Sequence, residues 1–167
     1  MSTYDLKALR NLLDASPTAR HVVHEAAKIL GSHGFTKWDG NGVPSAGHLS
    51  RGFFSRAGSI VAWSGIEKDS RLPLRMVGAH TDSPGLTLKP GPSASSFGFG
   101  LLNVEVYGGP LLNSWLDRDL ELAGVVTTTS GESVLFRSSE PVARISQLAI
   151  HLDRDVNDKG LVLDRHQ

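Results

Sequence analysis

The chain has 167 residues, and its 17 Lys and Arg residues balance its 17 Asp and Glu residues, so the formal net charge is zero. A neutral chain lacks the basic footprint of a nucleic-acid or anionic-membrane partner, and we expect neither. Cysteine is absent, which excludes disulfides and thiolate metal sites and leaves His and carboxylate as metal ligands. No apolar run approaches the ~20 residues of a membrane span, and Met1–Arg10 lacks a signal-peptide core, so we expect a cytoplasmic protein.

Two helices are predicted at the start of the chain. Leucines at helical spacing predict the first over Tyr4–Ala15. Ser16-Pro17 predicts a second helix to about Ser32, with Ser16 as its N-cap and Pro17 in its first turn. His21 and His24 lie one turn apart on this helix. They have no accompanying carboxylate or third His, so we interpret them as surface or helix-end residues rather than metal ligands.

The remaining elements are mostly short strands. Gly52–Ser55 and Ser59–Trp63 predict a hairpin through Arg56-Ala57-Gly58. Leu74–Ala79, an apolar run bounded by turn residues, predicts a buried strand, preceded by a charged surface loop at Glu67–Arg71. Further segments are expected as follows: a strand at Leu86–Lys89, a flexible linker and domain boundary at Pro90–Gly100, a half-buried strand at Leu102–Tyr107, a hairpin of Val125–Thr129 with Ser133–Arg137, and an edge strand at Pro141–Arg144.

A His-x-Asp pair, His80 and Asp82, follows the expected Leu74–Ala79 strand directly. It therefore lies at the carboxyl end of a strand, where open α/β sheets place their sites. Neutral imidazole is a common zinc ligand whose other ring nitrogen often donates to a carboxylate, so Asp82 either orients His80 or contributes to a metal site beside it. The alternative is a hydrogen-bonded His–Asp turn without metal, because a metal site needs three or four ligands.

Several blocks of the chain, in order, resemble one family. Val77–Leu86 closely resembles the metal-site strand of the aspartyl aminopeptidase and vacuolar aminopeptidase I family of dinuclear zinc exopeptidases. The pattern Leu-x-x-Ala-Ser-Pro-Thr-x-x-His that ends at His21 is similar to the start of that family. Tyr107–Leu120 and Ile145–Arg154 are similar to parts of its second domain. The resemblance covers the chain from about Leu9 to about Leu163.

The resemblance implies an α/β fold in two parts. Residues 1–90 would form an incomplete zinc-exopeptidase catalytic domain, and residues 91–167 part of a β-rich dimerisation domain. It implies an aminopeptidase that removes N-terminal residues from a peptide substrate by metal-activated water, with two zinc ions in the complete enzyme. A homo-oligomer formed through the β-rich domain is expected. The preference for acidic or neutral N-terminal residues does not follow from the resemblance.

The resemblance also assigns roles to individual residues. His80 is expected to bind metal, and Asp82 to be the catalytic carboxylate that orients it. His151 alone is typical of a core or interface histidine, but the resemblance implies that it reaches a neighbouring subunit's active site and contacts substrate. Asp117-Arg118-Asp119 supports either metal binding or a structural ion-pair turn in which Arg118 offsets its neighbours. The resemblance favours the structural turn.

The sequence supplies only part of such a site. It has no Glu-Glu pair and no later Asp-Asn or terminal His motif, although a dinuclear exopeptidase needs a bridging carboxylate, a glutamate base and further ligands. Three hypotheses follow: the N-terminal fragment of a working metalloaminopeptidase, a non-catalytic remnant or oligomerisation module, or an unrelated binding domain with a structural His–Asp turn. For a fragment, unpaired strand edges and uncovered apolar faces predict an oligomeric or aggregation-prone chain.

Overall fold

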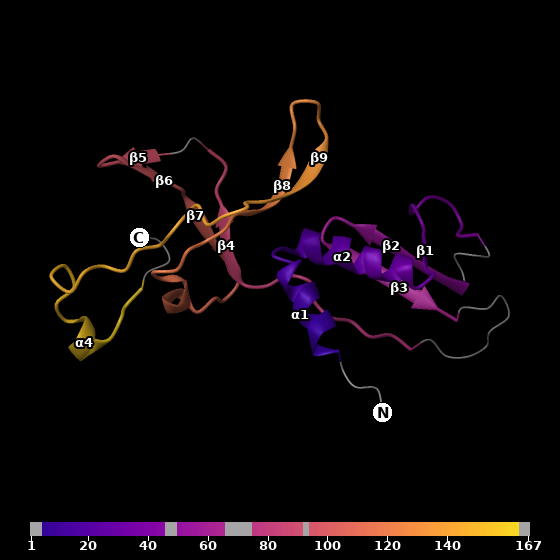
Figure 1. Ribbon diagram of the computed structural model, residues 1–167, viewed down its shortest axis with the longest axis horizontal. Helices are drawn as coiled ribbons and strands as arrows, with labels where there is room; N and C mark the ends of the chain where they lie inside the picture. The colour runs from indigo at the N-terminus through magenta and orange to yellow at the C-terminus, as the bar shows by residue number, and fades with distance from the viewer. Residues whose placement is uncertain (1–4, 46–49, 66–74, 92–93, 164–167) are drawn as a thin grey trace. The chain divides into compact units, whose positions relative to one another are not determined.

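The computed structural model describes residues 5–45, 50–65, 75–91 and 94–163. By its internal contacts the chain divides into two units (Figure 1). Unit 1 comprises Met1–Asp82 and Ala123–Arg137, and unit 2 comprises Ser83–Leu122 and Ser138–Gln167. Both helix and short strands are present, as an α/β class requires. The predicted domain boundary between residues 90 and 91 stays a prediction.

Unit 1 begins with two helices. α1 spans Leu6–Asp14, and the Asp5 carboxylate caps it by accepting from the Lys7 and Ala8 amides. α2 spans Ala19–Ser32. Both helices were predicted, although Tyr4, the expected first residue of α1, lies outside the described residues.

The predicted N-cap of α2 was wrong by two residues. Thr18, in an extended conformation, is the cap, and its hydroxyl accepts from the His21 amide. Ser16 and Pro17 form a bend before it. A serine before a proline satisfies the local N-cap pattern, but a threonine one residue after the proline satisfies it equally well, and the backbone selects the latter.

A three-stranded sheet of order β1-β2-β3 packs against α2. β1 is Thr36–Lys37, β2 is Arg51–Arg56 and β3 is Ser59–Ser64. β2 and β3 form the predicted hairpin, in register from Arg51↔Ser64 to Arg56↔Ser59. Figure 1 shows α2 running along these strands. Val23 of α2 and Phe53 of β2 are the buried hydrophobic residues of the described chain.

The β2–β3 turn approaches the first turn of α2 closely. Ala57, not Gly58, has the positive φ of this turn, +54°. A Cβ added at Gly58 would lie 3.1 Å from the Ala19 Cβ, which is tighter than an ordinary van der Waals contact. Glycine at position 58 is therefore explained by the nearness of the helix.

The predicted buried strand at Leu74–Ala79 was wrong over its described part. Arg75–Ala79 belongs to no strand of the described sheets, and the Met76 and Val77 side chains are 89% and 100% exposed. Leu74 and the predicted loop at Glu67–Arg71 lie outside the described residues. A strand needs a neighbour for its backbone N–H and C=O groups, and within the described ranges no strand pairs with this segment. A run of apolar residues indicates that a segment favours burial, but it does not show that a neighbouring strand is available to pair with it.

Unit 1 also contains the predicted late hairpin. β8 spans Ala123–Thr127 and β9 spans Ser133–Arg137, paired from Ala123↔Arg137 to Thr127↔Ser133. Gly131 in the turn has φ +84°. The Arg137 guanidinium donates to the Asp14 carbonyl at the end of α1 over 2.6 Å, which ties the hairpin to the helices.

In unit 2, β4 (Gly85–Leu88) and β7 (Val104–Tyr107) correspond to the strands predicted at Leu86–Lys89 and Leu102–Tyr107, and they pair antiparallel, which was not predicted. The flexible linker predicted over Pro90–Gly100 was wrong in part. β5 (Ala94–Ser96) and β6 (Phe99–Leu101) form a hairpin there. Its two turn residues, Phe97 and Gly98, have φ values of +51° and +83°, and positive φ at both central positions characterises a type I′ turn. The high Ser, Gly and Pro content of Pro90–Gly100 is typical of a linker, so the sequence did not indicate the pairing of β5 with β6.

The rest of unit 2 has little regular structure. η1, a 3-10 helix at Leu112–Trp115, precedes two isolated bridges, Leu116↔Ile145 and Leu120↔Ala143. The predicted edge strand at Pro141–Arg144 is reduced to the bridge at Ala143. α4 spans Val156–Lys159. Within the part of the chain that the structure describes, no helix combines the length and the apolarity that crossing a membrane requires.

Candidate functional site

The His80–Asp82 segment is held to unit 1 by Thr81. The Thr81 hydroxyl donates to the Gly58 carbonyl over 2.6 Å, so the segment is fastened to the β2–β3 turn although it forms no strand. The Thr81 side chain is partly buried, whereas His80 is exposed. The tether therefore places the two flanking residues, His80 and Asp82, at the surface of this turn.

The His80 imidazole is oriented by Asp82. Its Nδ1 lies 2.7 Å from the Asp82 backbone oxygen and 3.5 Å from the Asp82 carboxylate Oδ1. A backbone carbonyl only accepts, so Nδ1 must donate the proton to it. That assigns the tautomer in which Nε2 carries the lone pair, the form that a metal-binding histidine needs. The His80 side chain is 81% exposed, so Nε2 is accessible.

The donor set for a metal is incomplete in the described part of the chain. His80 fits as one zinc ligand by its tautomer and exposure. Among the described residues, no group of three His, Asp or Glu side chains lies close enough together to hold a metal ion. Since zinc sites use three or four ligands, the described residues would supply one ligand and its orienting group, not a whole site.

His151, the third predicted site residue, belongs to unit 2 and not to the unit that holds His80 and Asp82. It is exposed and lies in a turn in which the Leu152 and Asp153 amides both donate to the Ala149 carbonyl. The structure brings His80 and Asp82 together. The substrate contact predicted for His151 stays a prediction.

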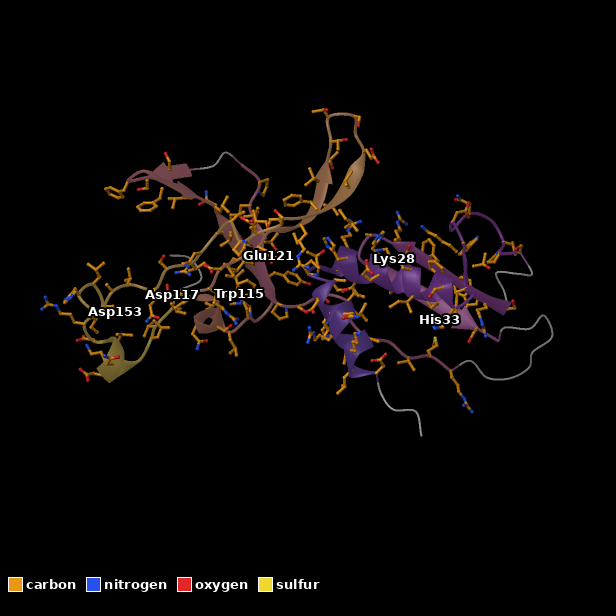
Figure 2. The ribbon with its side chains drawn as sticks, viewed as in Figure 1. Lys28, His33, Trp115, Asp117, Glu121 and Asp153 are labelled. Carbon is orange, nitrogen blue, oxygen red and sulfur yellow. The ribbon has the colours of Figure 1, made fainter. Side chains whose placement is uncertain are left out.

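Asp117-Arg118-Asp119 forms a structural turn, but Arg118 is not its ion-pair partner. Asp119 pairs with Arg144 at 2.7 Å, and the Asp117 carboxylate accepts from the Gln147 amide at 3.2 Å. The Arg118 guanidinium instead donates to the Ser114 carbonyl at 3.4 Å. The expected offset of charge by the sequence neighbour was therefore wrong. Figure 2 labels Trp115 and Asp117 at the end of η1 and just after it.

A shallow cavity of about 350 Å³ lies beside this turn in unit 2. It is lined by Ser114, Trp115, Arg118, Asp119 and Leu120. Trp115, half-buried, also packs near β4, where a Cβ at Gly85 would lie 3.7 Å from its ring. The cavity therefore opens between η1 and the Asp117–Asp119 turn. Sequence reasoning did not find the contacts of Thr81, Arg144 and Gln147, because each joins segments far apart in the chain.

Comparison with known proteins identifies the class. Residues 12–167 match the family described as aminopeptidase I zinc metalloprotease (M18). The chain belongs to this family.

A curated relative is the probable M18 family aminopeptidase 2 of Streptomyces avermitilis, which is 44% identical over 166 residues, covering 95% of this chain and 37% of the relative. The corresponding protein of Azotobacter vinelandii is 42% identical over 156 residues, covering 90% and 36%. This chain thus spans a little over a third of the length of the curated relatives that it matches. Because 44% identity extends over almost the whole chain, the relation is not confined to the His-x-Asp motif.

Solved structures agree with the family. The M18 aminopeptidase of Thermotoga maritima superposes with a TM-score of 0.75 at 27% identity, covering 92% of this chain and 35% of that one. The mApe1 dodecamer of S. cerevisiae superposes with a TM-score of 0.69 at 25% identity, covering 87% and 36%. The predicted fold class is confirmed by these likenesses: this chain is similar to about a third of each aminopeptidase chain.

Proposed function

We propose that this chain supplies the N-terminal part of a zinc-dependent aminopeptidase that removes N-terminal residues from peptides. The observation that supports this most directly is the His80 tautomer. Its Nδ1 donates to Asp82, and its exposed Nε2 keeps the lone pair for a metal. Membership of the M18 family supports the same proposal.

The residues of this chain would have three roles. His80 would be one zinc ligand. Asp82 would hold the imidazole in its tautomer through its backbone oxygen and its carboxylate, which lie 2.7 and 3.5 Å from Nδ1. His151 would contact the substrate in the active site of a second copy. Bound zinc, as two ions in the complete enzyme, would supply Lewis acidity for peptide-bond hydrolysis.

Self-association is part of this proposal. Structural relatives include a dodecamer, and the β-rich unit 2 leaves several large apolar side chains of β6 and β7 exposed, among them Phe99, Leu101, Val104 and Tyr107. A surface of this kind is typical of a protein–protein interface. We infer that unit 2 contributes to contacts between copies of the chain.

The competing proposal is that the chain is a non-catalytic oligomerisation module. The described residues provide one metal ligand rather than three, which is the observation that favours it. The two proposals differ in whether His80 binds zinc and whether peptides with a free N-terminus are hydrolysed.

Both proposals are tested by measuring zinc content and peptidase activity of the purified chain, the His80→Ala variant and a His24→Ala control. His24 is an exposed histidine on α2, away from the His80–Asp82 segment in the sequence. Because the described residues offer one ligand, we expect the chain alone to hold no zinc tightly and to be inactive. Joined to the remaining part of its Streptomyces avermitilis relative, the unmodified chain and the control should retain zinc and hydrolyse peptides, and the His80→Ala variant should lose both. N-acetylated peptides should not be cleaved, because an aminopeptidase binds the free α-amino group.

The pattern of loss separates the outcomes. Equal zinc in the joined forms of the unmodified chain and the His80→Ala variant contradicts a ligand role for His80. Absence of zinc and of activity from all three joined proteins, with self-association retained, favours the oligomerisation module.

A further inference from the structure

Two segments of unit 2 that lie far apart in the sequence are joined along their length. Leu116–Leu120 and Val142–Gln147 are connected by the bridges Leu116↔Ile145 and Leu120↔Ala143. The Asp117 amide donates to the Ile145 carbonyl over 2.8 Å, and the Leu120 amide donates to the Ala143 carbonyl over 2.9 Å. We call this arrangement the Asp clasp, because side chains of Asp117 and Asp119 complete it.

Asp117 holds the second segment through both its backbone and its side chain. Its φ of +52° lies in the left-handed region, which non-glycine residues adopt at a cost and which Asp and Asn tolerate best. In this conformation its amide reaches Ile145, and its carboxylate accepts from the Gln147 amide at 3.2 Å. The positive φ of Asp117 therefore occurs together with two hydrogen bonds to the same segment, one from its amide and one to its carboxylate.

Asp119 holds the segment at a second position. Its carboxylate accepts from the Arg144 guanidinium at 2.7 Å, with both side chains more than half exposed. Exposed ion pairs add little to stability, so this contact supplements the backbone bridges that join the two segments. Arg118, between the two aspartates, points to the Ser114 carbonyl instead. It takes no side-chain part in the clasp.

The clasp lies just before His151 in the chain. Three residues, Leu148–Ile150, lie between Gln147 and His151. His151 lies in a turn in which the Leu152 and Asp153 amides donate to the Ala149 carbonyl. Before this turn, the last backbone group that bonds to another segment in the described ranges is the Gln147 amide, which donates to the Asp117 carboxylate. Asp117 therefore holds the last fixed point of this segment before that turn, and Asp119 holds the earlier residue Arg144.

We propose that Asp117 and Asp119 are positioning residues that fix the segment leading into His151, so that its imidazole is presented in one direction. This inference rests on the proposed function for the role of His151, but not for the clasp itself. The aspartates are not expected to contact substrate or metal. They act by restricting the conformational freedom of the segment that leads into His151.

The clasp is tested by amide hydrogen exchange over residues 145–153 in the full chain. Asp117→Ala removes the acceptor for Gln147, and we expect its amide to exchange about fivefold to tenfold faster, the effect of losing one hydrogen bond. Asp117→Asn keeps an oxygen acceptor and a residue suited to positive φ, so it should retain most of the protection. Arg118→Ala is the matched control and should exchange like the unmodified chain. Unchanged exchange in Asp117→Ala, or an equal increase in Arg118→Ala, overturns the clasp.

The link to His151 is tested separately by peptidase kinetics of the chain joined to the remaining part of its Streptomyces avermitilis relative, because the chain alone is expected to be inactive. We expect Asp117→Ala and Asp119→Ala to raise KM more than they lower kcat, and to have no further effect on KM in a His151→Ala background. Additive effects in that background overturn the positioning role. Faster exchange together with a KM that does not depend on His151 contradicts the substrate role of His151 in the proposed function, while the clasp itself stands.

Discussion

At the scale of single residues, the candidate site consists of the His80 imidazole and the two Asp82 oxygens that lie near its Nδ1. The Asp82 carbonyl accepts a hydrogen bond from His80 Nδ1 at 2.7 Å, which leaves the lone pair on Nε2, as the proposed ligand role requires. The sequence indicated the two residues, since their spacing in an extended chain permits the contact. It assigned the orienting role to the Asp82 carboxylate, whereas the shorter contact is to the Asp82 backbone oxygen, which any residue at position 82 would offer. What distinguishes Asp82 is the carboxylate at 3.5 Å.

Thr81 fastens this pair to the fold, and its removal gives a specific prediction. Thr81→Val keeps the shape of the side chain but removes the donor to the Gly58 carbonyl. We expect the free energy of unfolding to fall by about 1 kcal/mol, the typical value of one intramolecular hydrogen bond. Urea denaturation checks this value. Thr81→Ser retains the hydroxyl and should lose much less, and equal losses in the two variants would contradict the tether.

At the scale of elements, the start of α2 is where helix, cap and hairpin meet. The Thr18 hydroxyl lies 2.8 Å from His21 Nδ1, and the half-buried His21 is close enough to Arg137 of β9 to feel its charge. Burial lowers the pKa of His21 below its ordinary value of 6.5, and the positive charges of Arg137 and His24 lower the pKa further against the opposing effect of Glu25.

This lowered pKa predicts how stability depends on pH. With the folded-state pKa below 6.5, the unfolded chain binds more protons as the pH falls through this range, so protonation favours unfolding. Stability from this group is fully present above about pH 6.5 and declines below it. Urea denaturation at pH 7.5 and pH 5.0 should show a smaller decline in His21→Gln than in the unmodified chain. His151→Gln, an exposed histidine of unit 2, is the control. A decline in His21→Gln equal to that of the control would count against the assignment.

Two hairpins with glycine-containing turns were predictable from the sequence. The absence of a strand over the described part of Leu74–Ala79 and the presence of the β5–β6 hairpin were not. The β2–β3 and β8–β9 hairpins follow from alternating residues around a glycine-containing turn. The strand expected at Leu74–Ala79 does not form in its described part, because its neighbours would have to come from elsewhere in the chain or from outside it. The β5–β6 hairpin was missed because Phe97, fully exposed in a positive-φ position, is not a usual turn residue.

At the scale of the whole molecule, the main feature is the amount of surface left uncovered. The buried hydrophobic residues of the described chain are Val23 and Phe53 alone, while α1 exposes Leu6, Leu9 and Leu13. The hydrophobic effect favours covering these exposed apolar side chains. The curated relatives are longer, and this chain covers 37% of one of them.

Self-association of the isolated chain is the prediction at this scale. We expect size-exclusion chromatography with light scattering to give an oligomer or an aggregate rather than a monomer. The Phe97→Ser/Phe99→Ser double variant, which removes two highly exposed rings from the β5–β6 hairpin, should weaken the association. A monodisperse, well-folded monomer would contradict both the uncovered apolar surface and the proposed role of unit 2.

The sequence by itself determined the family, both N-terminal helices, two hairpins and the His80–Asp82 pair, because each depends on residues within a few positions of one another or on ordered motifs. Tertiary structure alone decided the Thr18 cap, the Thr81 tether, the pairing of Asp119 with Arg144 and of Asp117 with Gln147, and the failure of Arg75–Ala79 to form a strand. The physical reason is that hydrogen-bond donors and acceptors are satisfied by whichever groups the fold brings near. For an exposed arginine or a short apolar run, proximity in sequence does not decide which groups those are.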